Sequence, residues 1–214
     1  GSFDFSKFTT LTGEIDSKSL TFSSLTAADW NSDLDGNGQT LSKDWLEAAF
    51  TNHGVDVSGL LDDIVQEFIL QKGQQRFSDP NITYVNEESG VIKFGLAGYF
   101  NASNLLKEAF GDAEILGTKI ADLVPSSVQA SELVKVEYEG KYSYFYSFSA
   151  TDSGQILNGS TNSHTGNYEM SFPLSALVNP LGVALVSTPE PITNIVSLFS
   201  VSVCGLLATR RKLD

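Results

Sequence analysis

Cysteine is almost absent from this sequence. The single residue of this type, Cys204, lies in an uncharged run near the C-terminus, and residues 1–188 contain no thiol. This excludes disulfides, metal–thiolate sites and a cysteine nucleophile from the larger part of the chain. We therefore expect residues 1–188 to be stabilised by a hydrophobic core alone, which a chain of this length can build.

Histidine is nearly as scarce, and familiar catalytic motifs are missing. The only histidines, His53 and His164, fall at a predicted helix end and in a polar stretch. The sequence contains no G-x-S-x-G, H-E-x-x-H or C-x-x-C motif and no glycine-rich phosphate loop. We therefore predict a protein that is not an enzyme, with a secreted hydrolase as the weaker alternative.

Basic residues are few. The chain has 13 Lys and Arg against 26 Asp and Glu, which gives a net charge of −13. A surface of this sign repels nucleic acid and anionic membranes, so we expect no nucleic-acid partner. The same charge favours solubility and the attraction of divalent cations.

The longest apolar run stands near the C-terminal end. Residues 192–209 contain no charged residue and no histidine, and as a helix of about 27 Å they would just span the hydrocarbon core of a bilayer. The run is preceded by Pro189, Glu190 and Pro191 and followed by a basic stop of Arg210, Arg211 and Lys212. Because basic residues tend to remain on the cytoplasmic side, we expect residues 1–188 on the outer side of the membrane.

This order of parts resembles the PEP-CTERM sorting signal of bacterial surface proteins. The resemblance implies a sorting motif at 189–191, a transmembrane helix at 192–209 and a basic end at 210–212. In that family an exosortase, a membrane enzyme similar to cysteine transpeptidases, recognises the motif and removes the helix and the basic end. The resemblance thus implies an exosortase-type partner, export to the cell surface or extracellular matrix, and transient anchoring. An ordinary C-terminal membrane anchor is the alternative.

Segments of the remaining chain are similar to an exported PEP-CTERM family found mainly in cyanobacteria, which has no assigned activity. The similar segments are FDFS at 3–6, LTG at 11–13, SLTAADW at 24–30, QRFSDPNI at 75–82 and FSATDSG at 148–154. The resemblance supplies no catalytic residues. Members of that family begin with a signal peptide, and residues 1–12 lack its basic and apolar regions, so we expect the start of the chain to be missing.

One loop carries the oxygen ligands of a calcium site. Asp33, Asp35 and Asn37 occupy positions 1, 3 and 5 of an EF-hand-type loop, and Gly38 stands at position 6. Position 12 falls on Asp44, in the first turn of a predicted helix, where a carboxylate could complete the Ca²⁺ shell. A threonine at position 8 and Asp instead of Glu at position 12 depart from the pattern. A plain Asp/Asn/Gly turn without an ion is the alternative.

The periodicity of residues 1–172 predicts one α+β domain, which the resemblance to a sorting signal implies is extracytoplasmic. Alternating patterns predict one antiparallel sheet made of strands within 8–25, 82–98, 132–149 and 167–172. Apolar spacings of three and four residues predict helices within 41–72 and 104–124, packed on one face of this sheet. Thr26 is a predicted helix N-cap, with Asp29 completing a capping box. Residues 173–188 are the expected linker to the sorting signal at 189–214.

The hairpin at 132–149 admits two registers. A three-residue loop at 139–141 would place Val136 and Tyr144 on one face, whereas a two-residue turn at Glu139-Gly140 would put the two apolar sets on opposite faces. Because register follows the buried pattern, we predict the three-residue loop. We interpret the hairpin's tyrosines as half-buried sheet packing, with a ligand-stacking platform as the alternative.

These patterns favour a non-enzymatic surface or extracellular-matrix protein that is delivered by exosortase-type sorting and associated with exopolysaccharide. A Ca²⁺-dependent carbohydrate-binding or adhesive module, using the acidic loop and the aromatic hairpin, is the alternative.

Overall fold

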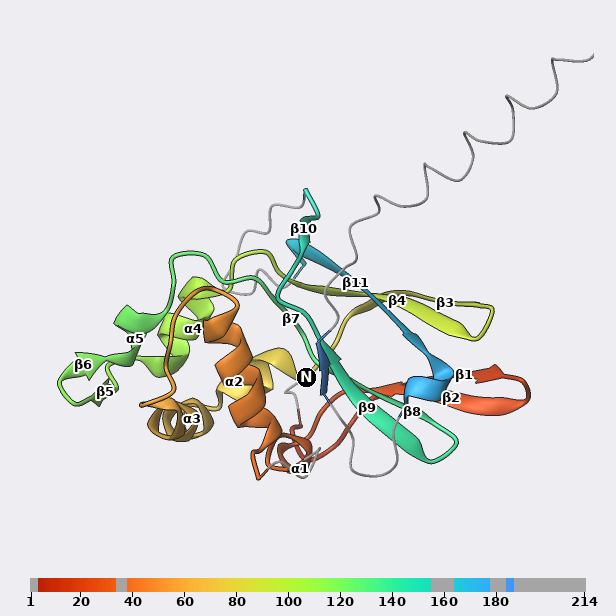
Figure 1. The fold of residues 1–214 in the computed structure, drawn as a ribbon, viewed down its shortest axis with the longest axis horizontal. Helices are drawn as coiled ribbons and strands as arrows, with labels where there is room; N and C mark the ends of the chain where they lie inside the picture. The colour runs from red at the N-terminus through yellow and green to blue at the C-terminus, as the bar shows by residue number, and fades with distance from the viewer. Residues whose placement is uncertain (1–3, 34–37, 155–163, 178–183, 187–214) are drawn as a thin grey trace, which may run out of the picture.

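The computed structural model describes residues 4–33, 38–154, 164–177 and 184–186. Two β-sheets face each other, and most helices gather beside them at one end of the molecule (Figure 1). The predicted α+β class is confirmed. The strands, however, form two larger sheets and a small two-stranded one, so the expectation of a single sheet is wrong.

Sheet A combines the N-terminal hairpin with the aromatic hairpin. Its order is β1-β2-β8-β9-β12, with β1 at Thr10–Ile15, β2 at Lys18–Ser23, β8 at Val134–Tyr138, β9 at Lys141–Tyr146 and β12 at Ala184–Val186. Neighbouring strands are antiparallel except β12, which runs parallel to β9. Strands β1 and β12 are therefore the two edges of sheet A among the residues that the structure describes.

Sheet B contains the longest strands. Its order is β10-β11-β4-β3, with β3 at Ile82–Glu88, β4 at Val91–Tyr99, β10 at Thr151–Asp152 and β11 at Gly166–Pro173. Strand β7, Ala130–Ser131, pairs with the end of β4. Strand β11 alternates strictly between buried and exposed residues, as expected of a strand with one face on the core and the other in water.

A shared hydrophobic core lies between the two larger sheets and explains why the strands form two sheets. Phe94 of β4 has its ring 5.3 Å from Phe22 of β2 and 5.5 Å from Phe145 of β9, so the apolar faces of the two sheets meet directly. Each sheet must bury one apolar face, and facing each other satisfies both at once. The buried members of this core are Leu20, Phe22, Ile92, Phe94, Leu96, Val134, Val136, Tyr138, Phe145, Tyr168, Met170, Phe172 and Leu177.

The helices form a second core around Trp45. Its ring lies 4.6 Å from Phe77, 5.7 Å from Phe68 and 5.8 Å from Trp30. Tyr144 belongs to this core and joins the helices to sheet A. The helices are α1 Ala27–Trp30, α2 Leu41–Thr51, α3 Leu61–Leu70, α4 Ser103–Phe110 and α5 Ile120–Leu123, with 3₁₀ helices η1 Gly73–Phe77 and η2 Leu174–Ala176.

The helices predicted within 104–124 are confirmed only at α4 and at the short α5. After α4 the chain forms a small hairpin of β5 at Glu114–Ile115 and β6 at Thr118–Lys119. Its turn, Leu116-Gly117, has positive φ at both residues, which a helix does not allow. The turn that contains Gly117 therefore interrupts the helix that the apolar spacing predicts.

The register predicted for the aromatic hairpin is also wrong. Tyr138 pairs with Lys141, so the turn is the two-residue Glu139-Gly140, with φ of 54° and 74°. Val136 and Phe145 face sheet B, whereas Tyr144 and Tyr146 face the helical core. Burial on both faces removes the reason for gathering every apolar residue on one face.

The C-terminal part can be compared only in places. Among the residues described, no helix is long and apolar enough to cross a membrane. The expected sorting motif, spanning run and basic stop all lie outside the described residues. Within the expected linker, Ala184–Val186 pairs with β9, so this short segment is part of sheet A.

Candidate functional site

Two rows of polar and aromatic side chains cross the outer side of sheet A, which is the side that faces away from sheet B. Cross-strand pairing aligns Thr10, Ser23, Lys135 and Tyr144 in the first row, and Thr12, Thr21, Glu137 and Tyr142 in the second. We call these eight residues the polar face. Each row presents two hydroxyls, one charge and one tyrosine across four strands, a width of about 14 Å.

Asp29 is held at the border of the polar face by the start of α1. One of its carboxylate oxygens accepts hydrogen bonds from the backbone N–H and the hydroxyl of Thr26, at 2.8 and 2.7 Å. This contact confirms the predicted capping box. The other oxygen accepts a hydrogen bond from the Tyr144 hydroxyl and lies 3.3 Å from the Lys135 ammonium.

These contacts keep Asp29 ionised although its side chain is only 13 % exposed. Burial alone would raise the pKa of Asp29, but the hydrogen bonds from Tyr144 and Thr26 and the charge of Lys135 outweigh it, and the pKa lies below its usual value. The same arrangement raises the pKa of the Tyr144 hydroxyl, chiefly through burial and then through Asp29. At neutral pH the border of the face therefore carries a fixed carboxylate and a neutral phenol.

Lys135 is positioned between the two tyrosines of the face. Its ammonium lies 4.4 Å from the centre of the Tyr142 ring and 5.7 Å from that of Tyr144. The two rings are perpendicular, with centres 5.8 Å apart. Tyr144 is buried, whereas Tyr142 is half-buried, so part of the Tyr142 side chain is exposed at the face.

A cavity of about 340 Å³ lies beside the polar face. Its lining includes Ser6, Thr10, Thr26, Asp29, Lys135 and Glu137. Hydroxyls donate and accept hydrogen bonds, carboxylates accept, and an ammonium donates. Such a lining is suited to a ligand that is itself rich in hydroxyl groups.

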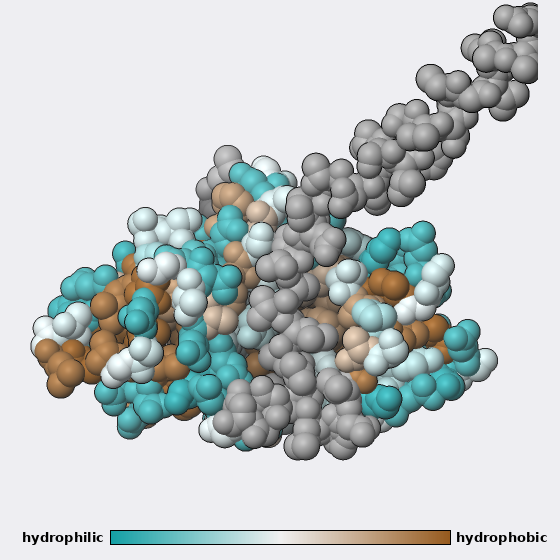
Figure 2. Space-filling model, in the orientation of Figure 1, coloured by the Kyte–Doolittle hydropathy of each residue, from teal (hydrophilic) through white to brown (hydrophobic). Residues whose placement is uncertain are grey.

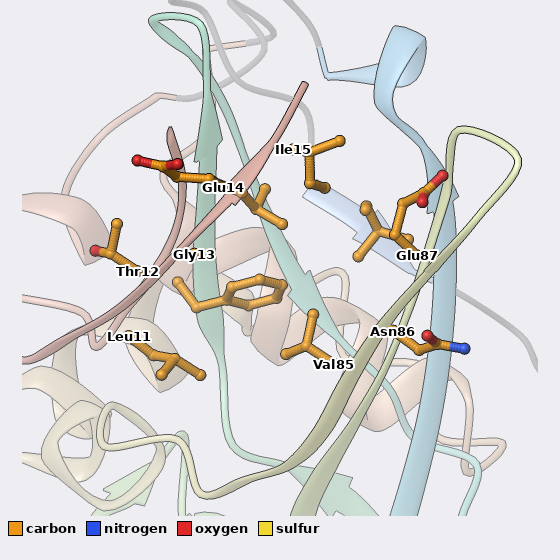
Figure 3. Close-up of a pocket in the computed structure, with 11 residues that line it drawn as sticks. Leu11, Thr12, Gly13, Glu14, Ile15, Val85, Asn86 and Glu87 are labelled. Atoms are coloured by element: carbon orange, nitrogen blue, oxygen red, sulfur yellow. The ribbon is translucent and has the colours of Figure 1, made fainter. Parts of the chain in front are cut away.

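A second cavity, of about 300 Å³, lies between the edges of the two sheets and is mainly apolar. Hydrophobic residues are visible between the sheets at the end away from the helices (Figure 2). In the close-up, Leu11 and Ile15 of β1 and Val85 of β3 point into the space between the strands, whereas Thr12 and Glu14 point away from it (Figure 3). We call this space the edge cleft.

The side chain of His53 and the backbone of His164 make structural contacts. The Nδ1 atom of His53 lies 2.7 Å from the Ala49 carbonyl oxygen, and its Nε2 atom accepts a hydrogen bond of 3.0 Å from the Gln129 backbone N–H. His53 thereby joins the end of α2 to the segment before β7. The backbone carbonyl of His164 accepts a hydrogen bond from the Ser153 hydroxyl.

Two pairs of carboxylates are adjacent in the sequence, Asp62-Asp63 and Glu87-Glu88, and members of both pairs make local contacts. Asp62 forms an ion pair with Lys43 at 2.8 Å, and Glu88 forms one with Lys93 at 2.6 Å. Glu87 accepts a hydrogen bond from the Gly90 backbone N–H, which closes the turn between β3 and β4. These are surface contacts, and neither of the two adjacent pairs lies with both members in one of the cavities.

One buried carboxylate lies outside both cavities. Glu132 is 5 % exposed, and burial raises its pKa to about 7 despite two hydrogen bonds from Asn81. Among the described residues, no Lys or Arg forms an ion pair with it. Glu132 lies between β7 and β8, and its hydrogen bonds join this segment to Asn81, which directly precedes β3.

The candidate calcium ligands are only partly described. Asp33 accepts a hydrogen bond of 3.0 Å from the Gly38 backbone N–H, and Gly38 has a φ of +85°, as the sharp turn of position 6 requires. Asp44 stands in the first turn of α2. Asp35 and Asn37 lie outside the described residues. Within the described ranges, no three His, Cys, Asp or Glu side chains form a metal-binding group.

No family model matches this chain, and neither the curated proteins nor the solved structures searched contain a significant match.

The polar face could not be identified from the sequence. Asp29 and Lys135 are 106 residues apart in the chain, and their contact depends on the pairing of β2 with β8. The alternation of Lys135 and Glu137 with buried valines was the one available signal, since it assigns both charges to the same side of β8.

Proposed function

We propose that this chain is an exported, non-enzymatic surface or extracellular-matrix protein that associates with exopolysaccharide through the polar face. The observation that carries this proposal is the alignment of hydroxyls, charges and tyrosines in two rows beside the cavity that Asp29 borders. The hydroxyls and charges match the hydrogen-bonding groups of a sugar, and the partly exposed ring of Tyr142 offers a flat surface for the apolar side of a sugar ring.

The charges of the face favour a neutral polysaccharide. Asp29 and Glu137 would repel anionic sugars, and the net charge of −13 acts in the same direction. The cation of the face, Lys135, already lies beside Asp29 and Tyr142. The expected ligand is therefore a neutral hydroxyl-rich polymer and not a uronic-acid or sulfated one.

The proposal is tested by binding of a neutral and an acidic polysaccharide, measured by affinity electrophoresis and calorimetry. Tyr142→Ala and Glu137→Gln should each weaken binding of the neutral polymer at least about fivefold, which corresponds to about 1 kcal/mol. Matched controls on the outer side of sheet B are Tyr84→Ala and Glu169→Gln, both at exposed positions. Equal losses for variants on both sheets, or unchanged binding for all four, would contradict the proposed face.

Delivery by exosortase-type sorting is the second part of the proposal, and it rests on the sequence of residues 189–214. Intact-mass analysis of the protein from its native cell tests it. A chain that ends near Pro189 supports cleavage at the motif. A chain that retains Arg210, Arg211 and Lys212 at the cell surface supports an ordinary membrane anchor in its place.

Calcium-dependent adhesion is a second candidate function. The observation that favours it is the hydrogen bond from Gly38 to Asp33, which holds positions 1 and 6 of the acidic loop in a closed turn ahead of α2. In such a site Asp33, Asp35, Asn37 and Asp44 would supply the oxygen ligands of Ca²⁺.

A further inference from the structure

Among the residues that the structure describes, the outer edge of β1 is open. Strand β1 ends the order of sheet A, and no strand among those described pairs with its outer side. Thr9, just before the strand, directs its backbone N–H and carbonyl toward Ser24. Because these groups alternate in direction along a strand, those of Thr10, Thr12 and Glu14 point to the open edge.

This edge has few of the features that usually prevent strand pairing, and Glu14 is its one charged residue. Strand β1 contains no proline and no lysine, and it pairs with β2 without a register shift. Strand β3, the edge of sheet B, also lacks proline and lysine but differs in its pairing and its charge. Its pairing shifts register between Ile82 and Tyr84, and it ends in consecutive acidic residues. Of the two edges that border the edge cleft, β1 is therefore the one suited to receive another strand.

Strand β1 also exposes apolar surface beside the open edge. Leu11 is 51 % exposed and points into the edge cleft (Figure 3). Gly13, two residues along the same side, has no atom within 4 Å of the position that a Cβ would take. One side of the strand thus offers a projecting leucine and, next to it, open space.

We propose that a second copy of this chain pairs with β1 antiparallel, about a two-fold axis at Thr12. In this register Thr12 lies opposite Thr12 of the second copy, and Thr10 lies opposite its Glu14. These are the residues whose backbone groups face the edge, so each such pair forms two hydrogen bonds. Other antiparallel registers that use these three residues form fewer pairs.

The same register places Leu11 opposite Gly13 of the second copy, twice by symmetry. Such pairs lack backbone hydrogen bonds and bring the two Cα atoms to about 4.5 Å, so a leucine fits well against a glycine. Each Leu11 then covers the open space beside Gly13 and extends the apolar surface of the edge cleft. The strand is self-complementary, as a two-fold interface requires.

Charge also fits this register. Glu14 faces a threonine and not another carboxylate, so no like charges lie directly opposite each other across the pair. The two copies still repel at long range because each carries a net charge of −13. Dimerisation should therefore strengthen as salt is raised from about 10 mM to 150 mM, over which the screening length falls from about 30 to 8 Å.

The dimer would make the polar faces of the two copies continuous, a consequence that rests on the proposed function. The row Tyr142, Glu137, Thr21 and Thr12 would continue into the same row of the second copy in reverse order. A long polysaccharide could then contact both faces, which raises its apparent affinity through effective concentration without any new contact.

Disulfide trapping tests the register. In the full chain with Cys204→Ser, Thr12→Cys should form a disulfide between copies under mild oxidation, because the paired Cα atoms lie about 5.5 Å apart. Thr10→Cys is the matched control, since the two copies of residue 10 would lie about 13 Å apart along the strands. Equal trapping at both positions, or none at residue 12, would overturn the proposal.

Sedimentation equilibrium of the full chain in a mild detergent tests the association itself. Thr12→Pro removes an N–H that faces the open edge and should weaken dimerisation at least about tenfold, whereas Thr12→Val should retain it. Circular dichroism and melting temperature show whether Thr12→Pro is folded. A folded Thr12→Pro chain that dimerises like the wild type contradicts the proposal.

Measurements of saccharide binding distinguish a failure of the proposed β1 dimer from a failure of the proposed polysaccharide binding. Tyr142→Ala should lose polysaccharide affinity and still dimerise. Glu14→Pro, outside the polar face, also removes an N–H that faces the open edge; this variant should bind short oligosaccharides like the wild type and lose only the added affinity for long chains. A chain that dimerises through β1 but binds no saccharide would contradict the proposed function and leave the interface intact.

Discussion

Asn81 donates two hydrogen bonds to one oxygen of the buried Glu132 carboxylate, from its backbone N–H at 2.8 Å and from its side-chain amide at 2.9 Å. Burial nevertheless dominates and raises the pKa of Glu132 from 4.5 to about 7. A carboxyl whose pKa is higher in the folded than in the unfolded chain stabilises the fold when protonated. Its contribution is complete below about pH 4.5 and is lost as the pH rises to about 7.

We expect Glu132→Gln to remove this dependence. The amide oxygen can still accept from Asn81 but cannot ionise, so the variant should exceed the wild type in free energy of unfolding by up to about 3 kcal/mol at pH 7.5. At pH 4.5 the two proteins should be nearly equal. Urea unfolding at both pH values measures the difference, and Glu169→Gln at an exposed position is the control. A difference that does not change with pH would refute this account.

The hydrogen bond from Tyr144 to Asp29 gives a second prediction. Tyr144→Phe should lower the free energy of unfolding by about 2 kcal/mol at pH 7, because the bond is made to a charged and largely buried group. The pKa of Asp29 is lowered in the folded chain, so its contribution is present above about pH 4 and is lost at lower pH. The effect of Tyr144→Phe should shrink accordingly. Tyr138→Phe, which loses a neutral bond of 3.4 Å to Ile15, should cost less at either pH.

Two buried serines should respond to substitution in opposite directions. Ser143 is 0 % exposed in the core between the sheets, and its hydroxyl has no hydrogen-bond partner among the described residues. Ser143→Ala should therefore stabilise the protein by about 1 kcal/mol. Ser131 is equally buried, but its hydroxyl donates to the Glu132 carbonyl and accepts from the Ser147 N–H. Ser131→Ala should cost about 1 to 3 kcal/mol in the same urea titration. A change in the free energy of unfolding that has the same sign for both variants would contradict this prediction.

Calcium binding at the acidic loop is a fourth prediction. If this site has the affinity of extracellular modules, with a Kd of about 1 mM, then 10 mM Ca²⁺ should stabilise the fold by about 1.4 kcal/mol. Asp35→Ala should abolish the effect, and Asp63→Ala, at an exposed position of α3, should not. Thermal unfolding with and without Ca²⁺, with Mg²⁺ for comparison, measures this. A melting temperature that does not change with Ca²⁺ would contradict a calcium site and support a plain Asp/Asn/Gly turn.

Local patterns predicted the elements of this fold better than their assembly. The capping box of Thr26 and Asp29 and the strand positions depend on neighbouring residues, and the structure confirms them. Which strands share a sheet depends on contacts between distant segments, such as Phe94 of β4 with Phe22 of β2. The alternation of apolar residues within a strand does not show which other strands it pairs with, and the prediction of a single sheet was wrong for this reason.

The aromatic hairpin shows the same limit at the level of the site. Its register depends on whether one or both faces of sheet A are buried, and this is known only once sheet B and the helices are in place. The correct register puts Lys135 and Tyr144 in one row and thereby brings Asp29 to the polar face. The predicted loop was one residue too long. This error assigned Tyr144 to the wrong face of the sheet, so the prediction missed the row at the site as well as the packing.

Strands β1 and β12 occupy opposite edges of sheet A, with β2, β8 and β9 between them. At a strand spacing of about 4.8 Å, the two edges are about 19 Å apart. If the chain that follows β12 holds the protein to a surface, as proposed, the β1 edge lies across the whole width of sheet A from β12. The point of tethering and the edge free for assembly would lie on opposite sides of one sheet, so that a tethered copy could still recruit another from solution.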